Sequence, residues 1–239
     1  MGAVLGIGLA LPISTSVGVA TVTGVAEGVS HQRKVNEEMN NDSRQLKFHI
    51  DVAVEGTKTH SVGVDGGIVI MKGDKVWIEQ KNSTTRQPAD PGSHPFTGFY
   101  LNYPDDEREM TRGLVSTISK DPPILNWLYV DKDTLEVKYA NRSGSRAHLV
   151  GDWDWTEEQG PNSNLTFDGW EGFVVLEEAK GKWALYFDVN DDGLKSKKGD
   201  RKSLEVSLNR RVISEQEVNK WGLGTEGNLG MKKTVRDTL

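Results

Sequence analysis

The chain has 239 residues, a formal net charge of −6 at pH 7, 36% hydrophobic residues and 27% charged residues, which is typical of an ordinary globular domain. It contains no cysteine, which excludes disulfides, thiolate metal ligands and a cysteine nucleophile. Its 29 basic residues are outnumbered by 35 acidic ones and form no long basic run, so we expect no nucleic-acid partner.

The first thirty residues are apolar and rich in glycine. No charged side chain occurs between Gly2 and Ala26, a stretch long enough to span a bilayer as a helix. Small residues recur at every fourth position, at Gly2, Gly6, Ala10, Ser14 and Gly18. On a helix this spacing lets two backbones approach closely in lipid, while Leu5 and Leu9 would contact the acyl chains. Residues 1–30 are therefore predicted to bind membrane lipid or to self-associate into a homo-oligomer, which favours a membrane-associated, cytoplasmic protein over a secreted one.

Two alternatives stay open for this segment. Residues 1–26 could be a secretory signal, although no basic residue precedes the apolar run. The segment could also pack into the core of the domain, because Ser16–Val25 is rich in the β-branched residues that favour strands.

Residues 31–46 are polar throughout and predict a linker or a short solvated helix. From residue 47 the hydrophobic pattern changes to a period of two over Phe48–Val54, which is typical of a half-buried strand. Turn residues then separate further predicted strands at 59–64, 68–72, 75–80 and 96–103.

The second half of the chain repeats this pattern of short strands and turns. Strands are predicted at 127–130, 135–139, 170–177, 183–189 and 204–208. A capping box at Ser214–Glu217 then opens a short helix, followed by a tail to residue 239. About ten short strands without long intervening helices predict a mainly β fold, an antiparallel β-sandwich or jelly roll over residues 47–213.

A loop rich in oxygen ligands follows one of these strands. Asp188, Asn190 and Asp192 occupy alternating positions before Gly193, as in calcium loops that supply oxygen ligands. The candidate calcium ligands are Asp188, Asn190, Asp192 and Leu194. Gly199 stands where an EF-hand has its bidentate glutamate, so the loop is not an EF-hand, and a plain β-turn explains the same residues.

Three tryptophans flank an acidic stretch and suggest a glycan as a further candidate partner. Trp153, Trp155 and Trp170 could stack on sugar rings while nearby carboxylates accept hydrogen bonds from sugar hydroxyls. The alternative is that these indoles fill the core, as we expect for Trp127 and Trp183.

No catalytic residue is predicted. The five histidines lack zinc-binding spacing, no nucleophile elbow occurs, and the glycine motif at Gly222–Gly227 has neither the strand nor the helix of a dinucleotide site. A pair of acidic residues acting in a small hydrolase or lyase stays open as an alternative, since carboxylates are abundant.

Several runs resemble a group of uncharacterised proteins from filamentous fungi. These are Asn102–Glu109, Pro122–Asp131, Gly151–Trp155 and Trp183–Asp188, and the resemblance covers roughly residues 96–210. It implies a fungal β-rich protein and carries no site residue. The order of apolar N-terminus, polar connector and β domain is also similar to that of actinoporin-like pore formers, without a residue-level match.

The preferred interpretation is a non-enzymatic β-sandwich protein that associates with membranes or with itself and forms pores or binds a ligand. The first alternative is a secreted, calcium-assisted carbohydrate-binding protein with residues 1–26 as its signal.

Overall fold

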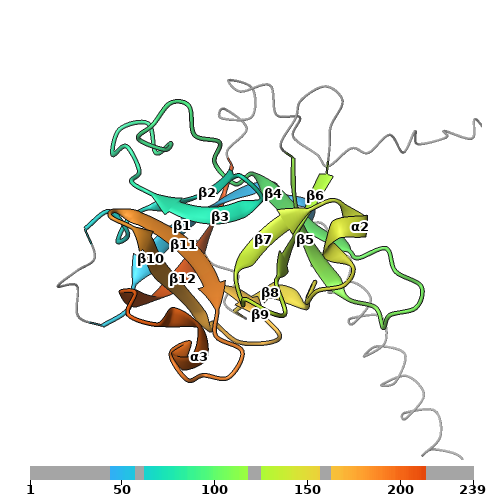
Figure 1. Cartoon of the computed structure of the whole chain (residues 1–239). Helices are drawn as coiled ribbons and strands as arrows, with labels where there is room; N and C mark the ends of the chain where they lie inside the picture. The colour runs from blue at the N-terminus through green and yellow to red at the C-terminus, as the bar shows by residue number, and fades with distance from the viewer. Residues whose placement is uncertain (1–43, 57–61, 118–124, 157–162, 214–239) are drawn as a thin grey trace, which may run out of the picture. The chain divides into compact units, whose positions relative to one another are not determined.

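The computed structural model describes residues 44–56, 62–117, 125–156 and 163–213 (Figure 1). All of them belong to Arg44–Leu239, one of the two units into which the chain divides. The predicted membrane segment, nearly all of the polar linker and the C-terminal helix and tail lie outside the described residues.

Twelve strands run through the described residues, and every pairing between them is antiparallel. They are β1 (Phe48–Val54), β2 (Ile68–Lys72), β3 (Lys75–Glu79), β4 (Gly98–Asn102), β5 (Arg112–Thr117), β6 (Leu125–Val130), β7 (Val137–Ala140), β8 (Trp153–Trp155), β9 (Leu165–Phe167), β10 (Phe173–Ala179), β11 (Lys182–Phe187) and β12 (Ser203–Val212). Two short helices, α2 (Arg142–Ser145) and α3 (Lys195–Lys198), follow β7 and β11.

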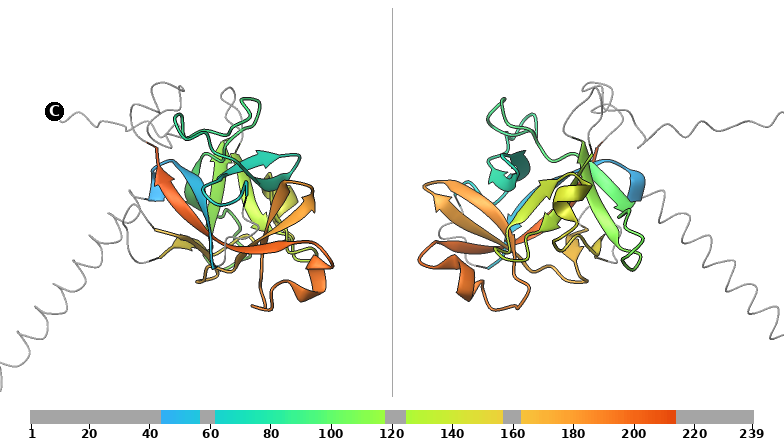
Figure 2. Two further views of the ribbon diagram at one scale, coloured as in Figure 1. Left: turned by 90° about the vertical axis from the view of Figure 1, so that its left-hand side faces the viewer. Right: turned by 45° about the vertical axis from the view of Figure 1, so that its right-hand side comes forward.

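Six of the strands close a barrel. Strand β1 pairs with β12 over its whole length, as Figure 2 shows, and with β4 at Phe48↔Gly98. Strand β4 pairs with β5, β5 contacts β8, and β8 pairs with β9. A bridge between Asn164 and Asn209 joins β9 back to β12. The order β12, β1, β4, β5, β8, β9 therefore returns to its start, which leaves these strands without a free edge.

The other six strands form three hairpins, β2–β3, β6–β7 and β10–β11, which meet one another. The contacts between hairpins are the pairs Lys75↔Lys138, Trp183↔Ile78 and Glu136↔Tyr186. Each hairpin thus touches both of the others, and together they form a triangular cap.

Within the described residues, one four-strand unit occurs three times. The units are β1–β4, β5–β8 and β9–β12. In each unit, one barrel strand precedes the cap hairpin and one barrel strand follows it. A six-stranded barrel with a triangular cap of three hairpins is a β-trefoil.

The prediction of a mainly β, antiparallel domain is confirmed. The arrangement of the strands is a trefoil and not the predicted sandwich, because six strands close into one ring instead of forming two facing sheets. The first predicted strand, Phe48–Val54, has the observed bounds, whereas β5, β8 and β9 were not predicted.

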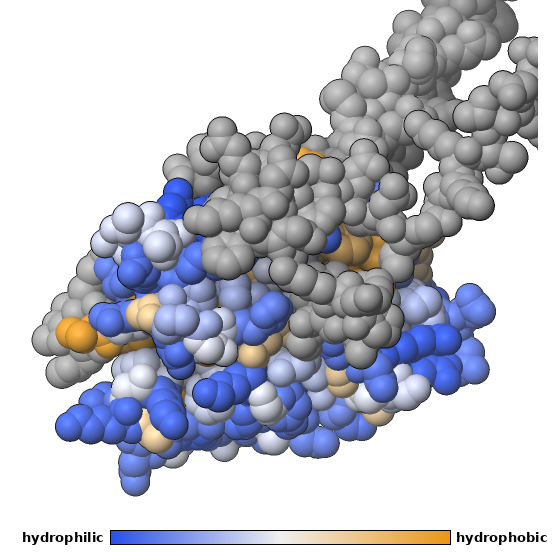
Figure 3. Space-filling model, turned by 90° about the horizontal axis from the view of Figure 1, so that it is seen from above, coloured by the Kyte–Doolittle hydropathy of each residue, from blue (hydrophilic) through white to orange (hydrophobic). Residues whose placement is uncertain are grey.

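A large hydrophobic core runs through the barrel and the cap, with fully buried aromatic rings such as Phe48, Phe96 and Phe173. A second, smaller buried cluster contains Trp127. Trp127 and Trp183 are buried as predicted. The described part of the face in Figure 3 is mainly hydrophilic. Among the described residues, no helix is both long and apolar enough to cross a membrane.

Candidate functional site

A cavity of about 240 Å³ opens where the third repeat meets the end of β1. It is lined by Glu55, Trp170, Glu171, Gly172, Phe173, Val174, Asp188, Asp191 and Glu205. Because five of these residues are carboxylates and none is basic, we call this cavity the acidic hollow. Its acids come from four segments, which are the residue after β1, the β9–β10 connection, the loop after β11, and β12 itself.

A tight turn places Trp170 at the hollow. Asp168 and Gly169 both have positive φ angles, of 50° and 85°, as the central residues of a tight hairpin turn do. The amide of Phe167 donates to the carbonyl of Trp170 at 3.0 Å across this turn. The indole then packs edge-on against Phe187, with ring centroids 5.3 Å apart, so its position is held from both sides.

Asp188 is the most buried acid of the hollow, with 4% of its surface exposed. Its Oδ2 accepts hydrogen bonds from the amides of Gly193 at 2.6 Å and Leu194 at 3.3 Å. Its Oδ1 has no hydrogen-bond partner within the described residues. A buried polar atom without a partner is costly, and Asp188 is one of the residues that line the hollow.

The other acids of the hollow have few partners. Glu55 accepts a hydrogen bond from the Ser207 hydroxyl at 2.6 Å, and Glu171 accepts one from the Asn164 amide at 2.8 Å. Among the described residues, no lysine or arginine forms an ion pair with any of the five carboxylates. Within the described part of the chain, the negative charge of the hollow therefore has no ion-pair partner.

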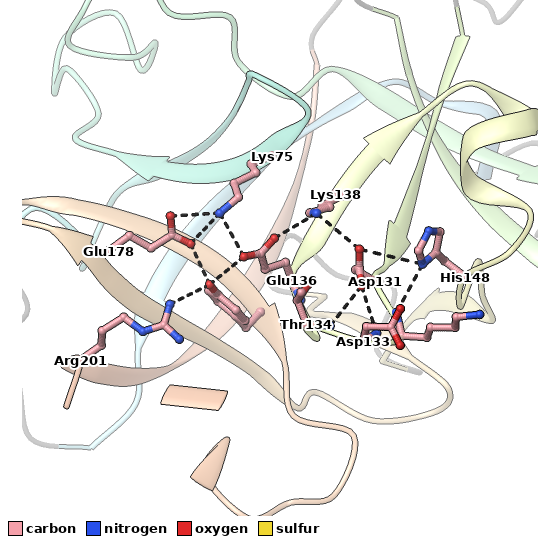
Figure 4. A network of polar contacts seen from close by, with 11 residues as sticks. Lys75, Asp131, Asp133, Thr134, Glu136, Lys138, His148, Glu178 and Arg201 are labelled. Carbon is pink, nitrogen blue, oxygen red and sulfur yellow. Dashed lines mark hydrogen bonds and ion pairs between the residues drawn. The ribbon is translucent and has the colours of Figure 1, made fainter. Parts of the chain in front are cut away.

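A second polar cluster joins the three cap hairpins (Figure 4). Lys75 of β3 lies 3.0 Å from Glu136 and 2.9 Å from Glu178, measured between Nζ and the carboxylate oxygens. The Tyr186 hydroxyl donates to Glu178 at 2.7 Å and accepts from Arg201 at 3.1 Å. We call these five residues the cap network.

The charges of the cap network satisfy one another. Burial alone would lower the pKa of Lys75, but its hydrogen bonds with Glu178 and Glu136 outweigh burial and raise that pKa. Burial and the hydrogen bond to Glu178 raise the pKa of Tyr186. The cap network therefore stabilises the junction of the hairpins. The acidic hollow, in contrast, has carboxylates that could bind a ligand.

The structure places the predicted calcium ligands in a loop where Asp188 Oδ2 and Asp192 Oδ1 accept hydrogen bonds from backbone amides of the same loop. Asp192 Oδ1 accepts from the amide of Lys195, Asn190 is exposed, and the side chain of Leu194 is buried. No group of three or more histidine or acidic side chains in the described ranges is arranged around a single metal position. A calcium ion at Asp188, Asn190, Asp192 and Leu194 stays a prediction.

The three predicted ligand-binding tryptophans separate in the structure. Trp153 and Trp155 are 1% and 7% exposed and belong to the core, so a stacked ligand does not fit their position. They share the inner face of β8, while Asp154 between them is half-buried. Trp170 borders the acidic hollow.

Sequence reasoning missed Glu55, Glu171, Asp191 and Glu205 as site residues. Glu55 and Glu205 reach the hollow because β1 and β12 pair, which places Val54 opposite Val206. No local motif signals this pairing. Trp170 and Glu171 are adjacent in the sequence, and this pair of an aromatic and an acidic residue was a local signal for the site.

Fold and cavity together define a β-trefoil with a concave, carboxylate-lined site of the size of a small ligand. The family model for the fungal β-trefoil domain matches residues 24–214, and the chain belongs to this family. The resemblance to fungal β-rich proteins is thereby confirmed, whereas the likeness to actinoporin-like pore formers is not. Neither the curated proteins nor the solved structures contain a match.

Proposed function

We propose that this protein is a non-enzymatic carbohydrate-binding domain whose ligand occupies the acidic hollow. The observation that carries this proposal is the buried Asp188, whose Oδ1 lacks a hydrogen-bond partner among the described residues and which lines the same cavity as Trp170. A sugar ring has an apolar face for the indole and hydroxyl groups that donate to carboxylates.

The size of the cavity supports a small ligand group. At about 240 Å³ it is smaller than the pockets of about 300–1,000 Å³ that enclose drug-sized ligands. One sugar ring, terminal or within a chain, is therefore a better match than an extended oligosaccharide enclosed along its length.

The test is a glycan array on the full chain, followed by calorimetry with the glycans that bind. Trp170→Ala and Asp188→Asn should each weaken binding at least about tenfold, equivalent to about 1.4 kcal/mol. Glu177→Gln is the matched control, because Glu177 lies on β10, outside the hollow, and pairs with Lys202.

Two outcomes would contradict the proposal. Unchanged affinity in both hollow variants would place the binding site elsewhere. Release of cleaved sugar from the bound glycan would contradict the non-enzymatic assignment and favour the alternative of a hydrolase or lyase with an acid pair.

For residues 1–30 we propose membrane binding or self-association, as the sequence predicts. The support is the uncharged stretch from Gly2 to Ala26 and its four-residue spacing of small side chains.

A further inference from the structure

We infer that the ligand of the acidic hollow is positively charged, and specifically that it is a sugar with a free, protonated amino group. This inference rests on the carbohydrate-binding function proposed above and names the class of sugar.

Charge pairing in the hollow differs from that of several other described carboxylates. Asp51 has cationic partners in Lys81 at 2.7 Å and Arg211 at 3.2 Å. Asp154 likewise pairs with Arg44 and Arg112. The five carboxylates of the hollow have no such partner in the described ranges, so a cationic ligand would meet no competing lysine or arginine from this part of the chain.

Asp188 is buried, and its Oδ1 has no hydrogen-bond partner among the described residues. A neutral hydroxyl would give its Oδ1 a hydrogen bond but would leave the buried charge uncompensated. An ammonium group supplies both a donor and a positive charge, and charge-assisted hydrogen bonds are roughly twice as strong as neutral ones.

The arrangement of the acids and the presence of Trp170 favour an organic cation over a metal ion. The acids belong to four separate segments, and two of them already accept hydrogen bonds from Ser207 and Asn164. Among the described residues they do not converge on one metal position. Trp170 adds an aromatic face, which attracts both an ammonium group and the apolar face of a sugar. An amino sugar presents both features to these groups.

The test compares two matched ligands on the full chain. Calorimetry is run with a trimer of glucosamine and with the trimer of N-acetylglucosamine, in EDTA at about pH 6, where carboxylates are ionised and an amine is protonated. We expect the glucosamine trimer to bind at least about tenfold more tightly, with a preference that falls as salt is added.

Variants locate the effect. Asp188→Asn and Glu205→Gln should each reduce the preference for the free amine, and Glu177→Gln should retain it. Glu205 is exposed, and its carboxylate accepts no hydrogen bond from the described residues, so its variant tests the charge even where Asp188→Asn disturbs the loop.

The outcomes separate this inference from the proposed function. Equal affinity for both trimers would overturn the amine inference and leave carbohydrate binding standing. Binding of neither trimer nor any other glycan would overturn both. A preference that survives in both hollow variants, or binding that requires added calcium, would also overturn the amine inference.

Discussion

Gly98 occupies the position where β4 passes between two barrel strands. It pairs with Phe48 of β1 and with Ser116 of β5. A Cβ at this position would overlap the carbonyl oxygen of Val115 and press on the ring of Phe96. Since backbone cannot yield easily, Gly98→Ala should lower the free energy of unfolding by about 2–3 kcal/mol, measured by urea denaturation.

Gly92→Ala is the control for this substitution. Its Cβ would meet only the Asp90 carboxylate, at 3.3 Å, so its unfolding free energy should stay within about 0.5 kcal/mol of the parent. Equal stability of the two variants would contradict the close approach at Gly98.

At the scale of single residues, the sequence predicts which side chains share a face but not what that face contacts. Trp153 and Trp155 lie on one side of β8 and Asp154 lies on the other. Only the closed barrel determines that this side is the core, where the Trp153 ring packs against Phe167 and Phe173. The hollow beside Trp170 is also lined by Glu55, which follows β1. The sequence around Trp170 does not show this neighbour.

At the scale of elements, the cap network links the three hairpins through one lysine. Lys75→Met would leave Glu136 and Glu178 adjacent without their shared cation. The pair is partly exposed, so we expect a loss of about 1–3 kcal/mol in unfolding free energy at neutral pH. Lys202→Met, which removes a mostly exposed partner of Glu177, should cost less than about 1 kcal/mol.

The pH dependence of this loss gives the prediction a sign. Burial alone would raise the pKa of Glu136, but hydrogen bonds from Lys75 and Lys138 lower it below its ordinary value. Its stabilising contribution is therefore present above the pKa of the unfolded chain, and it is lost as the pH falls through the lower folded value. The difference between Lys75→Met and the parent should narrow as the pH falls below about 4. A difference that is constant from neutral to acid pH would contradict the role of the carboxylates.

Hairpins are the elements that the sequence predicted best, because a strand, a turn and the next strand are contiguous. The β6–β7 and β10–β11 hairpins were both expected near their observed positions. Strands β8 and β9 have three residues each, too short for a periodic pattern to emerge. Strand β5 was missed because its sequence, Arg112–Thr117, shows little alternation.

At the scale of the whole molecule, the barrel is closed by its first and last strands. Seven register pairs join β1 to β12, from Phe48↔Val212 to Val54↔Val206, and the amide of Ile213 donates to the carbonyl of Lys47 at 3.0 Å. A chain of residues 44–213 contains this whole closure. We expect it to unfold cooperatively, with a midpoint within about 5 °C of the full chain.

A chain that ends at residue 202 is the matched comparison, because it lacks β12 and exposes the edges of both β1 and β10. It should show no cooperative transition by calorimetry or circular dichroism. Cooperative unfolding of that shorter chain would contradict closure by β12 as the condition for folding.

The N-terminal segment is tested on the full chain, because its predicted contacts lie outside the described residues. Flotation with liposomes should carry the full chain upward and leave behind a version that lacks residues 2–30, since the uncharged stretch between Gly2 and Ala26 supplies the apolar length. Gly6→Leu with Gly18→Leu keeps that length but fills the small-residue face, so it should abolish oligomers while flotation persists. Equal flotation with and without residues 2–30 would assign membrane binding to the β-trefoil. Unchanged oligomers in the double variant would remove the helix-packing argument while leaving the trefoil and its hollow as described.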